Sequence, residues 1–123
     1  MDTHILLWFL DEEHKLSEKA RNIIFNPDLQ KSVSIISLWE ISIKNRIGKL
    51  SLEGDMTNIF DKVKSNGFGV IGIEQEHIEI YNTLPLIHRD PFDGLIITTA
   101  ILEQMTIITA DEDIQKYDVP WIW

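Results

Sequence analysis

The chain has 123 residues, which is enough for one domain and too few for two, so we expect a single domain over residues 1–123. Acidic residues number 20 against 11 Lys and Arg, which gives a formal net charge of −9. So acidic a chain argues against broad binding of nucleic-acid backbones through a basic surface. It suits a pocket that holds cations, or a basic partner, although acidity can also serve solubility alone.

Cysteine and membrane signals are both missing from the sequence. The lack of cysteine excludes disulfides and thiolate metal sites and is compatible with a reducing compartment. No run approaches the roughly 18 apolar residues of a membrane span, and no N-terminal signal pattern is present. We therefore expect a cytoplasmic protein with no membrane partner.

The first third of the chain predicts helices around one short strand. Residues 4–10 are strongly apolar and predict a helix, and Ser17 fits the N-cap of a second helix over residues 18–25. Residues 31–35 are a short strand candidate.

The middle of the chain continues the alternation. Ser37-Leu-Trp-Glu40 matches a capping box and predicts a helix to about Ile47. Residues 55–65 predict a helix, residues 68–73 a buried strand weakened by its glycines, and residues 74–83 another helix.

The stretch from His88 to Asp111 contains the most informative pattern. Asp90 fits an N-cap and Pro91 the first helical turn. Asp93 heads the apolar stripe of this helix, where a carboxylate is costly unless something pairs with it. Residues 105–109 predict a buried strand, and Asp111 follows it directly, where α/β proteins place their ligands.

The end of the chain predicts a short helix around Ile114 and a final edge strand over residues 119–123. Strands that alternate with helices favour a parallel sheet covered on both faces. The fold class is therefore α/β.

Four acids stand at junctions between predicted elements: Asp2, Glu40, Asp93 and Asp111. In a parallel α/β fold, chain segments that leave the same sheet edge converge in space. Clustered carboxylates repel one another unless cations neutralise them, and oxygen ligands without cysteine suit Mg²⁺ or Mn²⁺. Such an ion can polarise a phosphoryl oxygen and activate water for hydrolysis.

Each acid also has a purely structural interpretation. Asp90 and Asp93 could cap their helix, and Glu40 could be the return half of its capping box. Asp111 could be a turn residue or N-cap, and Asp2 could belong to a frayed terminus. Spacing alone leaves these alternatives open.

Four segments taken together resemble the PIN-domain nucleases and, within them, the VapC-type toxins of bacterial type II toxin–antitoxin systems. The segments are Asp2-Thr-His-Ile-Leu-Leu-Trp, Ser37-Leu-Trp-Glu-Ile-Ser-Ile-Lys, Arg89-Asp-Pro-Phe-Asp-Gly-Leu-Ile-Ile and Ile108-Thr-Ala-Asp111. The resemblance covers essentially the whole chain, in order and at the spacings of that family.

The resemblance implies a PIN-like three-layer α/β/α fold with a central parallel sheet. It implies an endoribonuclease that depends on Mg²⁺ or Mn²⁺, hydrolyses RNA phosphodiester bonds, forms a homodimer, and is neutralised by a cognate VapB-like antitoxin. An Arg- or Lys-bearing segment of the antitoxin could occupy the acidic pocket in place of cations. The catalytic metal-binding acids would be Asp2, Glu40, Asp93 and Asp111, supported by Asp90 as a cap and by the Thr109 hydroxyl.

Two positions depart from the family. Relatives have several apolar residues before the first acid, which form the central first strand, whereas Asp2 follows only Met1. The first strand therefore appears truncated, and we expect either a start upstream of Met1 or a lost strand. Gly94 stands where many relatives carry Arg. The missing strand keeps open a catalytically silent PIN-like module that only binds a partner.

Other candidate residues carry weaker predictions. Lys44 could contact RNA or pair with Glu40 one helical turn away. Arg89 could contact phosphate or pair with Asp90, Trp39 is expected in the core or a partner groove, and His88 sits in no metal-ligand pattern. Haloacid-type phosphatases and receiver domains are disfavoured because their acid and lysine patterns are absent.

Overall fold

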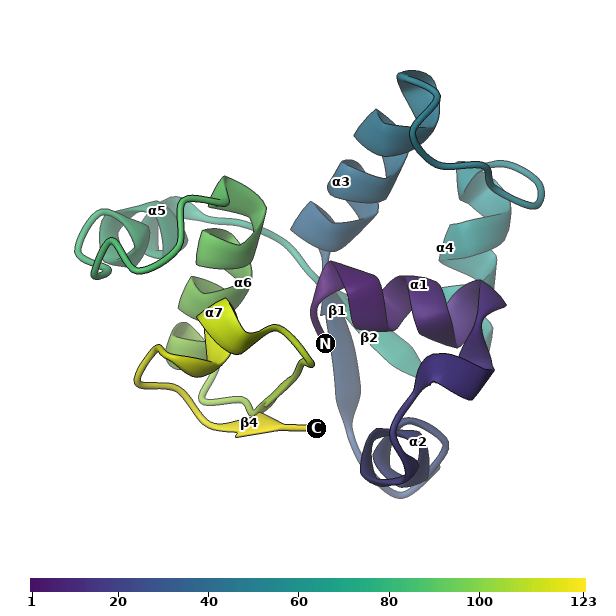
Figure 1. The fold of residues 1–123 in the computed structure, drawn as a ribbon, viewed down its shortest axis with the longest axis horizontal. Helices are drawn as coiled ribbons and strands as arrows, with labels where there is room; N and C mark the ends of the chain where they lie inside the picture. Colours follow the sequence, from purple (N-terminus) through teal and green to yellow (C-terminus); the bar gives the residue numbers. More distant parts are fainter.

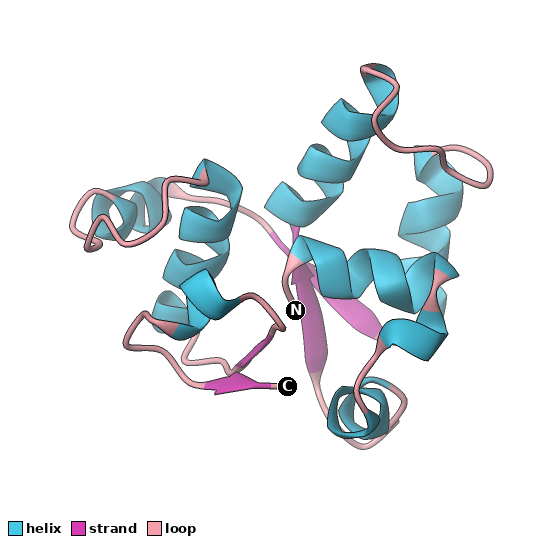
Figure 2. Ribbon diagram, in the orientation of Figure 1, coloured by secondary structure: helices cyan, strands magenta, loops and turns pink.

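A computed structural model describes residues 1–123, and it alternates helices with parallel strands (Figures 1 and 2). The elements are α1 (Thr3–Asp11), the 3-10 turn η1 (Glu13–Lys15), α2 (Glu18–Ile24), β1 (Lys31–Ser34), α3 (Ile35–Arg46), α4 (Met56–Ser65), β2 (Phe68–Ile71), α5 (Gln75–Tyr81), α6 (Pro91–Leu102), β3 (Ile107–Ile108), α7 (Glu112–Gln115) and β4 (Trp121–Ile122). The predicted α/β class is confirmed.

The strands form two separate parallel pairs. β1 pairs with β2, with Lys31 opposite Phe68, and β3 pairs with β4, with Ile107 opposite Trp121. No strand joins the two pairs, so the expected central sheet is divided. Figure 1 shows the N-terminus between the group formed by α5, α6 and α7 and the group that contains α1 to α4.

Local capping signals explain most helix starts. Ser17 caps α2 through a hydrogen bond from Ala20 N, and Asp90 caps α6, with Pro91 in the first turn, as predicted. The predicted cap at Ser37 is wrong. The cap of α3 is Ser34, which ends β1, so the helix begins directly after the strand and Ser37 lies buried inside it.

The strand predicted over residues 105–109 is shorter than expected. The Met105 N–H donates to the Ala100 carbonyl at 2.8 Å, and Gln104 adopts a φ of 53°. Met105 therefore still belongs to the turn that ends α6, because left-handed residues of this kind close helix C-termini. Only Ile107 and Ile108 remain in β3.

Two clusters of buried apolar side chains make the core. The larger has 12 buried residues, drawn mainly from α1, α2, α3, α4 and the β1–β2 pair, with Ile5, Leu6 and Ile41 fully buried. The smaller has 7 buried residues from α6, β3, α7 and the segment before β4, centred on Ile97 and Ile114. No helix combines the length and apolar character needed to cross a bilayer.

Candidate metal centre

Asp2 anchors the start of α1 against the end of β3. Its backbone N–H donates to the Ile108 carbonyl at 3.0 Å, and its Oδ1 accepts the Ile5 N–H at 2.9 Å. The second carboxylate oxygen accepts a hydrogen bond from the Thr109 hydroxyl. Asp2 is buried, not frayed, because both chain and side chain are fixed.

The Thr109 hydroxyl links two of the predicted acids. It donates to Asp2 and accepts the backbone N–H of Asp111 at 3.0 Å. Asp111 in turn caps α7, since its Oδ1 accepts N–H groups from Asp113 and Ile114 at 2.8 and 3.2 Å. The N-cap interpretation of Asp111 therefore holds, but it uses only one of the two carboxylate oxygens.

His88 joins the loop before α6 to two acids. Its Nε2 lies 2.8 Å from Asp93 Oδ2, and its Nδ1 lies 3.6 Å from Asp113 Oδ2. Its backbone N–H donates to the Tyr117 hydroxyl at 3.0 Å, which fixes the loop against the end of α7. Asp90 stands beside this pair and accepts the Phe92 and Asp93 N–H groups, as a cap does.

Burial and negative neighbours disturb the protonation of this group. The pKa of Asp93 is raised to about 6, mainly by burial and then by the negative charges of Asp90 and Asp2, against the opposing hydrogen bond from His88. Burial also raises the pKa of Asp2, against the opposing hydrogen bonds from Thr109 and Ile5 N. Negative charge is therefore poorly compensated at this place.

The charge around His88 acts in the opposite direction. Desolvation works to lower the pKa of His88, but the hydrogen bond to Asp93 and the charges of Asp93, Asp111 and Asp113 outweigh it. The net result is a raised pKa, so the imidazole holds a proton more readily than an ordinary histidine. A cation at this site would compete with that proton.

The sequence of the chain matches a known protein family. A model of the PIN domain matches residues 1–120. The chain belongs to the PIN-domain family. PIN domains are typically metal-dependent nucleases. A search of curated proteins found no match.

Two overlapping sets of three side chains in this PIN domain have the donor spacing of a metal site. One is His88, Asp90 and Asp93, and the other is His88, Asp111 and Asp113, with ligand atoms within 4.8 Å of one another. Carboxylate oxygens with one imidazole suit Mg²⁺ or Mn²⁺. The donor set fits such an ion, whose charge would stabilise the buried Asp93 carboxylate and offset its repulsion by Asp90.

Of the four predicted acids, Asp93 and Asp111 belong to these sets and Asp2 and Glu40 do not. Glu40 is buried on α3, and its Oε2 forms an ion pair with Lys44 Nζ at 2.7 Å. It is not the return half of a capping box, because Ser34 caps α3. The intrahelical Lys44 pair predicted as an alternative is present.

The helix that carries Glu40 is nevertheless tied to the other site helices. The Thr3 hydroxyl donates to Ser37 at 3.1 Å, and the rings of Trp39 and Phe92 meet edge to face at 5.5 Å. Trp39 is 57% exposed, so it does not lie in the core, and the alternative of a contact in a partner groove stays a prediction. The helix of Glu40 therefore packs against α1 and α6, although Glu40 itself belongs to neither set of candidate metal ligands.

Sequence reasoning missed His88 and Asp113. The prediction that His88 has no metal-ligand pattern is wrong, because it belongs to both sets. Its position two residues before Asp90 was the available signal. The Gly94 departure also has a structural reason, since a side chain there would collide with the Tyr81 ring. Arg89 is exposed and forms no ion pair with Asp90.

Proposed function

We propose that this PIN domain is an endoribonuclease that depends on Mg²⁺ or Mn²⁺ and hydrolyses RNA phosphodiester bonds. The observation that carries the proposal is that two sets of donors, one with Asp90 and Asp93 and the other with Asp111 and Asp113, share His88 and have the spacing of a metal site. A divalent cation would be stabilised by the negative charge of these carboxylate oxygens and would offset their repulsion.

The residues divide the work as follows. Asp93 would bind an ion in one set and Asp111 in the other, with His88 common to both, and Asp2 would contribute from its fixed place beside Thr109. Glu40 would join only after exchange of its Lys44 partner. A bound cation supplies charge stabilisation for the phosphoryl oxygens and lowers the pKa of water. An ion held by His88 would displace the proton that this imidazole otherwise binds more readily than an ordinary histidine.

Cleavage of defined RNAs tests this proposal. The purified protein is incubated with a panel of tRNA and rRNA fragments in Mn²⁺ or EDTA, and the cut ends are mapped. We expect discrete cuts in Mn²⁺ only, reduced about 1,000-fold or more by Asp93→Asn, since metal-site charge contributes several kcal/mol. Asp61→Asn makes the same chemical change on the exposed part of α4 and should leave activity intact. Equal cutting by both variants would contradict the proposal.

We also propose that the protein is a VapC-type toxin and that a VapB-like antitoxin blocks it with a basic segment. The ion pair of Lys44 with buried Glu40 supports this, because it is an ammonium group that already neutralises a candidate site acid. A synthetic Arg-rich antitoxin segment should then compete with Mn²⁺ in a titration. Segment binding that is unaffected by Mn²⁺ would refute the mimicry.

We further propose a homodimer through the surface around α5. Leu86 is 96% exposed, Ile78 51% and Ile87 41%, which is a concentration of apolar side chains that a monomer rarely leaves open. Leu86→Glu should therefore shift the protein to monomer in sedimentation velocity. An unchanged sedimentation coefficient across concentrations would place the dimer elsewhere or exclude it.

A catalytically silent partner-binding module is the second candidate. The observation in its favour is that Glu40 is already paired with Lys44 and that Asp2 lies outside both three-ligand sets. A silent module would bind partners but give no metal-dependent cuts from any RNA in the panel. The cleavage experiment therefore separates the two candidates directly.

A further inference from the structure

An exposed pair of aromatic rings joins α3, which carries Glu40, to α6, which carries Asp93. Trp39 of α3 and Phe92 of α6 meet edge to face, with 5.5 Å between the ring centroids and 64° between the ring planes. We call these two residues the aromatic pair. Trp39 is 57% exposed, and neither ring belongs to the two clusters of buried apolar side chains. Packing in the core therefore does not account for these rings.

Each ring of the aromatic pair is next in sequence to an acid of the candidate site. Trp39 precedes Glu40, and Phe92 lies between Asp90 and Asp93. The Phe92 N–H donates to Asp90 Oδ1 at 2.8 Å, so a residue of one metal set fixes the backbone of Phe92. Because neighbouring Cα atoms are only about 3.8 Å apart, a nucleotide whose phosphate lies at the candidate ion site brings a base close to the aromatic pair.

The charge of the chain favours a nucleobase as the group that the aromatic pair binds. A net charge of −9 leaves little positive surface to hold RNA by its phosphates. Aromatic side chains stack on the faces of bases without needing positive charge, and single-stranded RNA presents bases that are free to stack. The exposed Arg89 forms no ion pair, so one positive charge in the same loop is available for a flanking phosphate.

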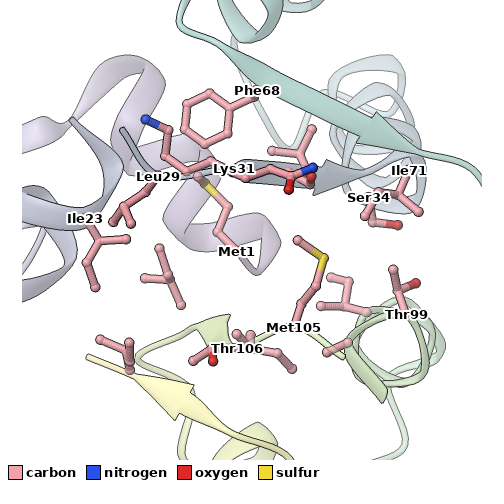
Figure 3. A pocket seen from close by; sticks show the side chains of 18 of the residues that line it. Met1, Ile23, Leu29, Lys31, Ser34, Phe68, Ile71, Thr99, Met105 and Thr106 are labelled. Atoms are coloured by element: carbon pink, nitrogen blue, oxygen red, sulfur yellow. The ribbon is translucent and has the colours of Figure 1, made fainter. Parts of the chain in front are cut away.

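A mainly apolar cavity of about 420 Å³ offers a base no comparable position. Met1, Phe68 and Met105 are among the side chains that line it (Figure 3). Neither ring of the aromatic pair lines this cavity, and no residue of the two candidate metal sets does. A base inside it would contact none of those ligands, so the aromatic pair is the surface better placed for the RNA at the metal centre.

We propose that the aromatic pair stacks on an unpaired base of single-stranded RNA, beside the nucleotide whose phosphate is hydrolysed. Trp39 supplies the exposed stacking surface, and Phe92 supports it through the edge-to-face contact. Because this RNA is the substrate of the proposed nuclease, the assignment rests on the proposed function. It narrows the substrate to RNA with an unpaired base at the cut, as in a loop or a single-stranded end.

Binding of short RNA tests the stacking without relying on cleavage. The protein is titrated in EDTA against a labelled single-stranded RNA and against an abasic oligomer that has the same sugar–phosphate backbone and no bases. We expect the native protein to bind the RNA about tenfold or more tightly than the abasic oligomer. Trp39→Ala should lose this preference, and Trp39→Phe should keep most of it. Trp121→Ala removes another exposed tryptophan, on β4, and should leave the preference unchanged.

The two oligomers separate stacking from other roles of Trp39. Equal binding of both by the native protein would overturn the proposal and leave the aromatic pair to a partner protein. Equal weakening of both by Trp39→Ala would also overturn it, because a purely structural role affects both alike. In Mn²⁺, cleavage by Trp39→Ala at an unchanged KM would contradict the stacking but not the nuclease. A base preference that depends on Trp39, without any cut in Mn²⁺, would support stacking on RNA and contradict the nuclease.

Discussion

The acids of the two halves of the molecule are compensated very differently. In the first half, Asp2 receives hydrogen bonds from Thr109 and Ile5, and Glu40 holds Lys44 at 2.7 Å. In the second half, Asp93 and Asp111 share one histidine, His88, and neither pairs with a lysine or arginine. Glu40 is therefore already neutralised by a lysine, whereas the second-half acids have only a shared histidine and belong to the sets with metal-ligand spacing. Metal binding should begin in the second half.

The core of the first half is larger than that of the second, with 12 buried residues against 7. Core substitutions should therefore give the largest effects on stability. Ile41 belongs to the 12-residue cluster and Ile114 to the 7-residue cluster, and both are fully buried. Ile41→Ala should reduce the free energy of unfolding by about 4 kcal/mol and Ile114→Ala by about 3 kcal/mol. Urea denaturation measures both, and a larger loss at Ile114 would reverse this ranking of the halves.

Metal addition should sharpen the comparison. At 100 times its dissociation constant, Mn²⁺ should stabilise the native protein by about 2.7 kcal/mol through mass action. Asp93→Asn should abolish this gain, whereas Asp2→Asn should only reduce it, because Asp2 already has two hydrogen-bond partners. Thermal melts with and without Mn²⁺ give the comparison. Equal losses in both variants would mean that the halves contribute equally.

Removal of Lys44 should make the stability of the first half depend on Mn²⁺, as we expect for the second half. Lys44→Met leaves the buried Glu40 carboxylate unpaired and should cost about 1–2 kcal/mol in EDTA. Mn²⁺ should restore more stability to this variant than to the native protein, since the freed carboxylate becomes a ligand. Lys15→Met removes an exposed lysine from an exposed glutamate, Glu12, outside both metal sets and serves as the control, with no measurable loss expected.

Local sequence patterns predicted the helix cap at Asp90 correctly, but they could not predict contacts between residues far apart in the sequence. The cap at Asp90 with Pro91 depends on neighbouring residues alone, so the sequence contains all of it. The pairing of Thr109 with Asp2 spans 107 residues and requires the folded chain.

His88 and Ser37 show the same limit. The position of His88 depends on Tyr117, 29 residues away, so its nearness to Asp90 in the sequence was the only local signal and could not show that it is a ligand. The local capping box at Ser37 gave way to the tertiary arrangement, because β1 runs directly into α3 and Ser37 instead accepts the Thr3 hydroxyl. Strong local patterns therefore located the acids, while the fold decided which of them meet.

The smallest predicted effect is a pH dependence that only the second half should show. The pKa of Asp93 is raised from 3.8 to about 6 in the folded protein, so the native state binds more protons than the unfolded chain between these values. The metal-free protein should therefore be most stable near pH 4 and lose stability as the pH rises to about 6. Because the group is partly exposed, we expect a loss of only about 1 kcal/mol. Urea denaturation in EDTA at stepped pH measures it, and Asp93→Asn should flatten the curve while Asp61→Asn leaves it unchanged. A loss of stability that persists in Asp93→Asn would instead be assigned to Asp2, because burial raises the pKa of that carboxyl group as well.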